Sequence, residues 1–177
     1  MAILKLINAS GQVLTHLVMS KSHLAPLNKE YTIPRLELMA DRVSVDIFLL
    51  LRREMQFSAV PFFFWTDSSI LLAYISSETR RFNVFVENRV NYIRQHTEVS
   101  SWGYVRSRAN PADLLTKYRP ISGQGVISLW LDGPAWLKEY IPMWSKQTVS
   151  PPEFAVSEND PEVKGQFTAC VTQVVNA

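Results

Sequence analysis

Short apolar runs and longer amphipathic stretches follow one another along the first two thirds of the chain. Residues 2–6 and 13–19 are short apolar runs separated by Asn8-Ala9-Ser10-Gly11, and this pattern predicts a β-hairpin. After Pro34, apolar residues recur every three or four positions to about residue 55, which predicts a helix with Glu37 in its first turn. The apolar positions expected to face the core are Leu36, Met39, Ala40, Val43, Ile47, Leu50 and Leu51.

The next elements are marked by an aromatic run and by helix-capping residues. Residues 62–65 are all aromatic and too few for a helix, so they predict a buried central strand that ends at Asp67. Helices are expected from Ser68 or its neighbour and from about residue 83, a further strand over residues 101–105, and a last helix after Asn110. This order indicates a mixed α/β fold, in which carboxylates at strand ends and helix starts gather at one edge of the sheet.

Composition and punctuation divide the chain into three parts. Hydrophobic residues make up 47% and charged residues 19%, a balance typical of globular proteins. We expect a domain over residues 1–119, a Trp- and Pro-rich extension over 120–145, and a linker-like tail over 146–177. No stretch reaches the roughly 18 apolar residues of a membrane span, so we expect no membrane partner and a soluble intracellular protein, cytoplasmic or nuclear.

Three carboxylates stand where these elements begin or end. Glu37 lies on the first long helix, Asp67 follows the aromatic strand, and Asp113 is the third residue of the last helix. Each has a structural alternative, because an acid near a helix start is favoured by the free backbone N–H groups and the helix dipole. Carboxylates from three elements are also what two-metal phosphodiester chemistry requires, since Mg²⁺ binds converging anionic oxygens. Spacing alone leaves both interpretations open.

Five blocks of sequence resemble the ribonuclease H domain of BEL/Pao-type retrotransposon polyproteins, in the same order. They are MSKSHLAP at 19–26, TIPRLELMA at 32–40, FFWTDS at 63–68, RRFNVFVENRV at 80–90 and NPADL at 110–114. The similarity runs from about Ile3 to Leu137. It implies a ribonuclease H-like mixed five-stranded sheet with flanking helices, and an enzyme that uses Mg²⁺ to cut the RNA strand of RNA–DNA hybrids.

The resemblance also implies a set of site residues and partners. Three of the family's four metal-binding carboxylates fall on Glu37, Asp67 and Asp113, whereas the first, an Asp on the first, central strand, has no counterpart. That strand would lie upstream of Met1, so we expect a domain truncated at its N-terminus. The implied partners are RNA–DNA hybrid and the reverse transcriptase and integrase regions of the parent polyprotein.

Basic residues offer candidate contacts to nucleic acid. Up to Ser145 the chain has 16 Lys and Arg against 12 Asp and Glu, an excess that permits phosphate contacts. The candidates for binding a hybrid's backbone are Arg80, Arg81, Arg89, Arg106 and Arg108. The structural alternative for each is an ordinary solvated surface arginine.

Three functional hypotheses follow from these observations. The first is a retrotransposon-derived ribonuclease H that is weak or inactive as this chain, because the first Asp is absent. The second is a non-catalytic module, derived from the same domain, that binds nucleic acid or a protein partner. An integrase core ranks third, because Cys170 is the only cysteine and a His/Cys zinc region needs more. The β-branched residues at 167–175 predict a strand that could fill the vacant sheet position.

Overall fold

The computed structural model describes residues 1–25, 31–56, 60–115, 123–141, 144 and 154–164, and the strand predicted over 167–175 lies outside them. Strands and helices are interspersed in the described ranges, which confirms the predicted mixed α/β class. The strands are β1 (Ala2–Ile7), β2 (Val13–Met19), β3 (Phe64–Thr66) and β4 (Trp102–Tyr104). The α-helices are α1 (Ile33–Glu54), α2 (Ser69–Ser76), α3 (Val84–His96) and α4 (Gln124–Asp132).

The predicted hairpin is confirmed. β1 and β2 pair antiparallel, with Ile7 opposite Val13 next to the turn. Asn8 closes this turn, because its side-chain Oδ1 accepts hydrogen bonds from the backbone N–H of Ser10 and Gln12 at 3.1 and 2.8 Å. Gly11 has a φ of 80°, a conformation that a residue with a Cβ rarely adopts.

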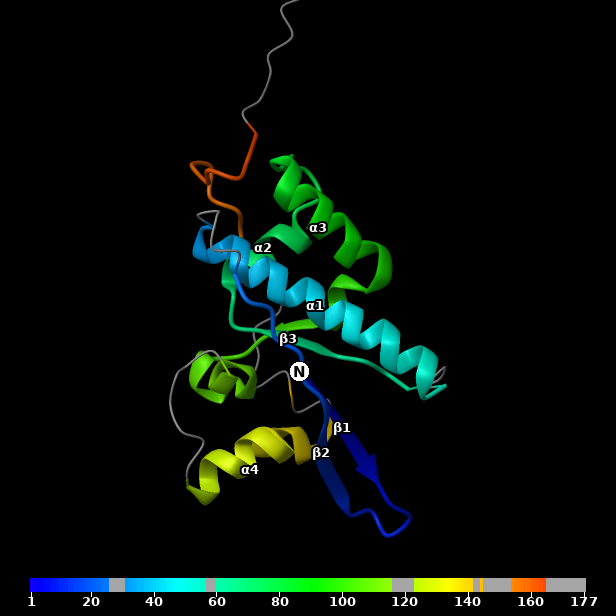
Figure 1. The fold of residues 1–177 in the computed structure, drawn as a ribbon. Coiled ribbons are helices and arrows are strands. Elements are labelled where there is room, and N and C mark those ends of the chain that lie inside the picture. The colour runs from blue at the N-terminus through cyan, green and yellow to red at the C-terminus, as the bar shows by residue number, and fades with distance from the viewer. Residues whose placement is uncertain (26–30, 57–59, 116–122, 142–143, 145–153, 165–177) are drawn as a thin grey trace, which may run out of the picture.

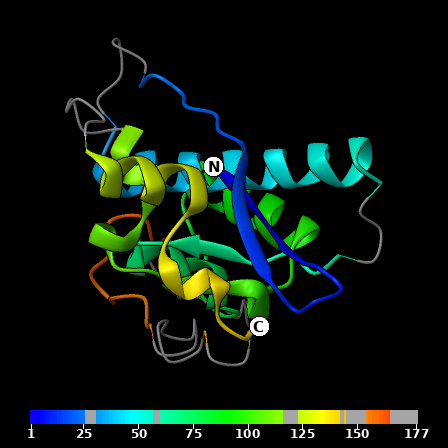
Figure 2. The same cartoon turned by 90° about the horizontal axis from the view of Figure 1, so that it is seen from below.

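The described strands form two separate two-stranded sheets. β3 and β4 pair in parallel, with Thr66 opposite Tyr104, and the chain between them forms α2 and α3. The hairpin is the other sheet, so the single five-stranded sheet implied by the resemblance is not seen in the described part of the chain. Figure 1 shows α1, α2 and α3 above β3 and the hairpin with α4 below it, and in Figure 2, seen from below, the hairpin lies in front of α1.

Helix α1 confirms the predicted element but buries a different face. Its fully buried positions include Leu38, Val45 and Phe48, together with Asp41. Of the seven apolar positions predicted to face the core, only Ile47 is in the buried set. The predicted place of Glu37 in the first turn is also wrong, because the helix begins at Ile33, one residue before Pro34.

Helix α2 is the centre of the core, because five of its eight residues are buried. The Ser68 hydroxyl caps its start by accepting a hydrogen bond from the N–H of Leu71, as predicted. Its other end is covered from α3, where the Arg94 guanidinium donates to the carbonyl oxygens of Tyr74, Ile75 and Ser77. These are carbonyls of the last turn and of the residue after it, which the helix itself leaves unbonded.

A tryptophan cluster covers the other side of β3. The ring centre of Trp65 lies 5.1 Å from that of Trp136 and 6.0 Å from that of Trp144. Lys5 of the hairpin lies over the Trp144 ring, 4.9 Å from its centre. The cluster therefore joins β3 to the hairpin and to the segment that follows α4.

Replacement of Gly103 by alanine is expected to destabilise the fold by about 1–3 kcal/mol, as overpacking does. A Cβ at this position would overlap the Trp65 ring and lie 2.7 Å from its Cε3 atom. Trp65 has little freedom to move, because it packs against Trp136 and Trp144. Urea unfolding followed by tryptophan fluorescence measures the effect. Gly125→Ala is the matched control, since a Cβ there meets nothing within 4 Å, and an equal loss in both variants would contradict the prediction.

Residues 154–164, called here the C-terminal segment, pack against the body of the domain although they lie within the predicted linker-like tail. Val163 forms a β-bridge with Phe82, and the Tyr74 hydroxyl donates a bifurcated hydrogen bond to the two carboxylate oxygens of Asp160, at 3.0 and 2.9 Å. Glu162 is buried and binds Arg35 at the start of α1. The segment thus connects the first turns of α1 and α3.

None of the helices in the described ranges combines the length and the apolar character needed to cross a membrane.

Candidate active site

The carboxyl ends of β3 and β4 meet at one edge of their sheet. Asp67 follows β3 directly, and the backbone N–H of Val105, just after β4, donates to the carbonyl oxygen of Thr66 at 2.9 Å. Arg106 is the next residue along the chain. Because the strands are parallel, Asp67 and the loop that begins at Arg106 are placed at the same edge.

Asp41 brings an unpredicted carboxyl group to this edge. It lies on α1, one helical turn after Glu37, and only 9% of its surface is exposed. Its Oδ2 atom accepts a hydrogen bond of 3.1 Å from the Thr66 hydroxyl. The same Thr66 oxygen accepts a hydrogen bond of 3.2 Å from the N–H of Ser68. Asp41 is therefore held against the last residue of β3.

The electrostatic surroundings place two further acids near Asp41. Burial raises the pKa of the Asp41 carboxyl to about 8, against the opposing hydrogen bond from Thr66. The negative charges of Asp67 and Glu37 raise this pKa further, in that order. The predicted residues Glu37 and Asp67 are thus both close enough to act on a buried, mostly protonated carboxyl group. Both are half-buried.

Asp113 lies on a short 3-10 helix, Pro111–Leu115, after the loop that leaves β4. Asn110 caps this helix by accepting a hydrogen bond of 3.1 Å from the N–H of Ala112, which confirms the predicted cap. Asp113 occupies the first turn, as predicted, and is half-buried.

The arrangement of these acids determines whether they can hold a divalent metal. Carboxylate oxygens are the right donors for Mg²⁺, but several must converge on one point. Within the described ranges, no three Asp, Glu, His or Cys side chains are placed to hold a metal ion together. Glu37, Asp67 and Asp113 in this arrangement do not fit a two-metal centre.

Four of the five predicted arginines fall into two places. Arg106 and Arg108 are exposed on the loop between β4 and Asp113, at the same edge as Asp67. Arg80 and Arg81 follow the C-terminal end of α2, whereas Asp67 precedes its start. Arg80 lies 3.7 Å from Glu158 of the C-terminal segment, and the Arg81 carbonyl accepts from the Lys164 N–H at 2.9 Å.

Arg89 lies on α3, away from the other predicted arginines. Its guanidinium carbon is 3.5 Å from the centre of the Phe85 ring, and its Nη1 donates to the Phe85 carbonyl oxygen at 2.9 Å. Burial lowers the pKa of Arg89, and the nearby charges of Arg42 and Arg35 lower it further, with Tyr31 opposing them.

Asp41 was missed by the sequence analysis, although the sequence contains a signal for it. Leu38, Asp41, Val45 and Phe48 follow one another at spacings of three and four residues, which place them on one face of a helix. A carboxyl group on an apolar helix face is costly to bury and marks a special environment.

Residues 1–68 match the family model described as "Pao retrotransposon-like RNaseH-like domain". The matched region contains Glu37, Asp41 and Asp67 and ends at Ser68. No curated protein and no solved structure matches the chain. The match confirms the predicted resemblance over these residues, whereas Asp113 and the five predicted arginines lie beyond them.

Proposed function

We propose that this protein binds RNA–DNA hybrids and cleaves their RNA strand weakly or not at all, because residues 1–68 match the Pao retrotransposon-like RNaseH-like domain. The observation that supports hybrid binding most is the edge shared by Asp67, Arg106 and Arg108. Arginine guanidinium groups bind phosphate oxygens in bidentate geometry and position a nucleic acid without reading its sequence.

Weak hydrolysis follows from the arrangement of the acids. Two-metal cleavage needs carboxylates that converge on both cations, and Glu37, Asp67 and Asp113 do not do so within the described residues. Asp41, whose pKa both Glu37 and Asp67 raise, is mostly protonated at neutral pH. Glu37, Asp67 and Asp113 are therefore candidate ligands for Mg²⁺ only after a rearrangement that makes the three converge.

Wild-type protein is expected to cut the RNA of a labelled hybrid in Mg²⁺ at a rate close to background. The measurement is the rate of product formation at saturating protein, compared between wild type and Asp67→Asn. Background-level rates in both proteins are the expected result. Rapid Mg²⁺-dependent cleavage that Asp67→Asn abolishes would overturn the proposed weakness of hydrolysis, and it would establish Asp67 as a catalytic residue.

Binding without catalysis is the second candidate function, and the exposed Arg106–Arg108 loop favours it. Changing Glu37, Asp67 and Asp113 together to their amides is expected to leave hybrid affinity unchanged or to raise it, because negative charges beside the phosphates are removed. Arg106→Gln with Arg108→Gln is expected to lower the affinity and its salt dependence. Fluorescence anisotropy over a range of salt concentrations measures both. Hybrid affinity equal in wild type and the arginine double variant would rule out this edge as the binding surface.

The family also suggests partners for the intact element. We propose that this domain acts together with the reverse transcriptase and integrase regions of a parent polyprotein, because reverse transcription produces the RNA–DNA hybrid. A pull-down with separately expressed reverse transcriptase from such an element tests this. Retention that disappears in moderate salt would indicate charge attraction alone and would count against a specific interface.

A further inference from the structure

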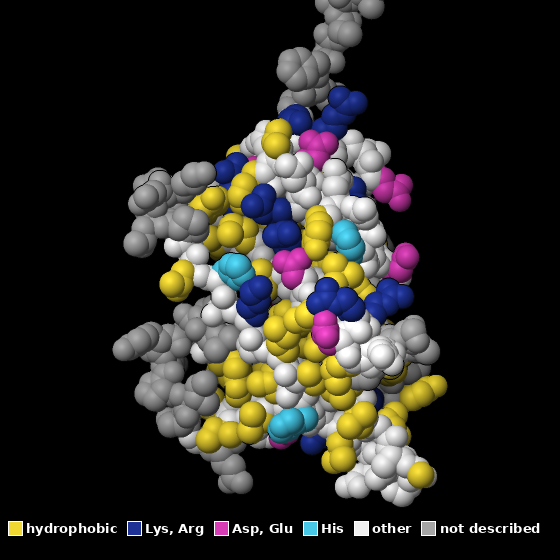
Figure 3. Space-filling view, turned by 45° about the vertical axis from the view of Figure 1, so that its right-hand side comes forward, with side chains coloured by type: hydrophobic (Ala, Val, Ile, Leu, Met, Phe, Trp, Pro, Cys, Tyr) yellow, Lys and Arg dark blue, Asp and Glu magenta, His cyan; other side chains and the backbone are white. Residues whose placement is uncertain are grey.

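A row of three arginines, Arg42, Arg52 and Arg89, follows the seam between α1 and α3 and is called here the arginine ladder. The guanidinium carbon of Arg42 lies 4.7 Å from the ring centre of Tyr92, and that of Arg89 lies 3.5 Å from Phe85. Figure 3 shows Lys and Arg side chains gathered on the upper half of this face, over α1 and α3, with hydrophobic side chains between them. The ladder is thus made of cations that rest on aromatic rings.

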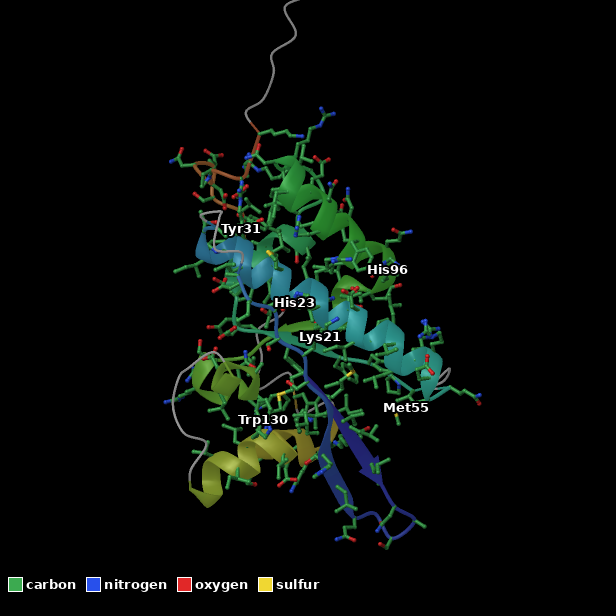
Figure 4. The ribbon with its side chains drawn as sticks, viewed as in Figure 1. Lys21, His23, Tyr31, Met55, His96 and Trp130 are labelled. Carbon is green, nitrogen blue, oxygen red and sulfur yellow. The ribbon has the colours of Figure 1, made fainter. Side chains whose placement is uncertain are left out.

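The ladder continues along α1 and ends beside an open pocket. Arg52 lies ten residues after Arg42, about 15 Å along the helix, and its guanidinium carbon is 5.9 Å from the Phe48 ring centre. Arg52 and Phe48 also line a pocket of about 330 Å³, together with Phe62 and His96. Figure 4 labels His96 at this end of the seam, and it shows Lys21 and His23 in front of α1. The lining also includes Phe64 and a second cation, Arg94, as well as one acid, Glu98.

The ladder has more positive charge than its surroundings neutralise. Arg35, which also lies near this seam, is fully paired, because Glu162 accepts from its Nε and Nη2 at 2.5 and 3.0 Å. Arg42, in contrast, has only a loose contact of 3.9 Å with Asp46. Arg89 has no acidic partner among the described residues, and its buried Nε atom has no acceptor there.

Arg52 is unpaired in the same sense. It forms no ion pair with an acidic side chain in the ranges that the structure describes, whereas the adjacent Arg53 lies 2.7 Å from Glu54. Arg42 and Arg89 lie on two packed helices with one weak carboxylate contact between them, and their like charges repel each other. The pKa of Arg89 is lowered first by burial and further by the charge of Arg42.

We propose that the arginine ladder and its adjoining pocket bind a single strand of nucleic acid, with phosphates on the arginines and an unpaired base in the pocket. Arginine binds phosphate oxygens through its planar fork, and bases stack on aromatic rings and on guanidinium planes. A base can enter a pocket only when it is unpaired, so the ligand is single-stranded. The proposal rests on the proposed function in taking nucleic acid as the ligand, but it uses a different surface from the Asp67 edge.

The full chain is tested by fluorescence anisotropy with labelled oligo(U) and, separately, with an RNA–DNA hybrid. Arg42→Gln with Arg52→Gln is expected to lower oligo(U) affinity about tenfold at low salt and to reduce the slope of log affinity against log salt by about 1.4. Arg53→Gln removes a paired cation from the same helix and is expected to change oligo(U) affinity less than about twofold. Circular dichroism verifies that each variant is folded.

The two binding measurements distinguish failure of this proposal from failure of the proposed function. Oligo(U) affinity that is absent in wild type, or unchanged in the Arg42/Arg52 variant, overturns the arginine ladder as a binding surface, whatever the hybrid does. A lack of hybrid binding with oligo(U) binding intact contradicts only the proposed function. A phosphopeptide that displaces labelled oligo(U) more strongly than unlabelled oligo(U) would also overturn the proposal, because the base pocket would then contribute nothing.

Discussion

Replacement of Glu162 by alanine is expected to lower the free energy of unfolding by about 2–4 kcal/mol, because it leaves Arg35 without its carboxylate. Glu162 is 4% exposed and accepts two hydrogen bonds from the Arg35 guanidinium. The backbone of the same residue receives the N–H of Asn83 at 2.7 Å, so its side chain and main chain anchor the starts of two helices. Urea unfolding followed by circular dichroism measures the loss.

Glu158→Ala is the matched control for this prediction. Glu158 lies in the same C-terminal segment and faces Arg80 at 3.7 Å, but its side chain is 88% exposed. An exposed ion pair contributes at most about 1 kcal/mol, and a change of less than about 0.5 kcal/mol is expected. Equal effects of the two substitutions would show that the C-terminal segment does not stabilise the domain through Glu162.

Wild type is expected to lose stability as pH rises towards 8. Replacement of Asp41 by asparagine is expected to remove most of this loss. The pKa of Asp41 is about 8 in the folded protein and 3.8 without these surroundings. The folded state therefore holds one proton more than the unfolded state between these values. This contribution to stability is full below about pH 4 and is lost as pH rises through the folded pKa.

The slope from this one group reaches at most about 1.4 kcal/mol per pH unit. Asparagine keeps an oxygen to accept the Thr66 hydrogen bond but has no charge to bury, so the variant is expected to be the more stable protein at pH 9. Glu37, Asp67 and the α-amino group of Met1 are the charges that face Asp41, and they are present in both proteins. Urea unfolding at a series of pH values compares the slopes. Parallel profiles of unfolding free energy against pH in wild type and variant would contradict the raised pKa of Asp41. Glu54→Gln, which removes an exposed carboxylate, is the control.

Local patterns in the sequence predicted those parts of the fold that local forces determine. The Asn8–Gly11 turn, the Ser68 cap of α2 and the Asn110 cap before Asp113 each depend on residues within four positions of one another. The buried face of α1 was not found in this way. Prediction from the spacing of apolar residues places every acid on the exposed face of a helix, whereas Asp41 is buried in line with Leu38 and Val45.

The C-terminal segment was beyond such reasoning for a different reason. It contains polar and acidic residues and follows two prolines, which is typical of a linker. Its packing comes from single pairs far apart in the chain, such as Arg35 with Glu162 and Tyr74 with Asp160. The same limit applies to the candidate site, because the spacing of Glu37, Asp67 and Asp113 along the chain says nothing of their distances in space.

The bonds from Arg94 to the last turn of α2 have a consequence for how the domain opens. Because a side chain of α3 satisfies the carbonyls at the end of α2, fraying of that end requires Arg94 to lose its acceptors in a buried place. The two helices should then exchange their amide protons as one cooperative unit, with similar protection near Tyr74 and Ile93. A solvent-capped helix end would exchange independently and much faster.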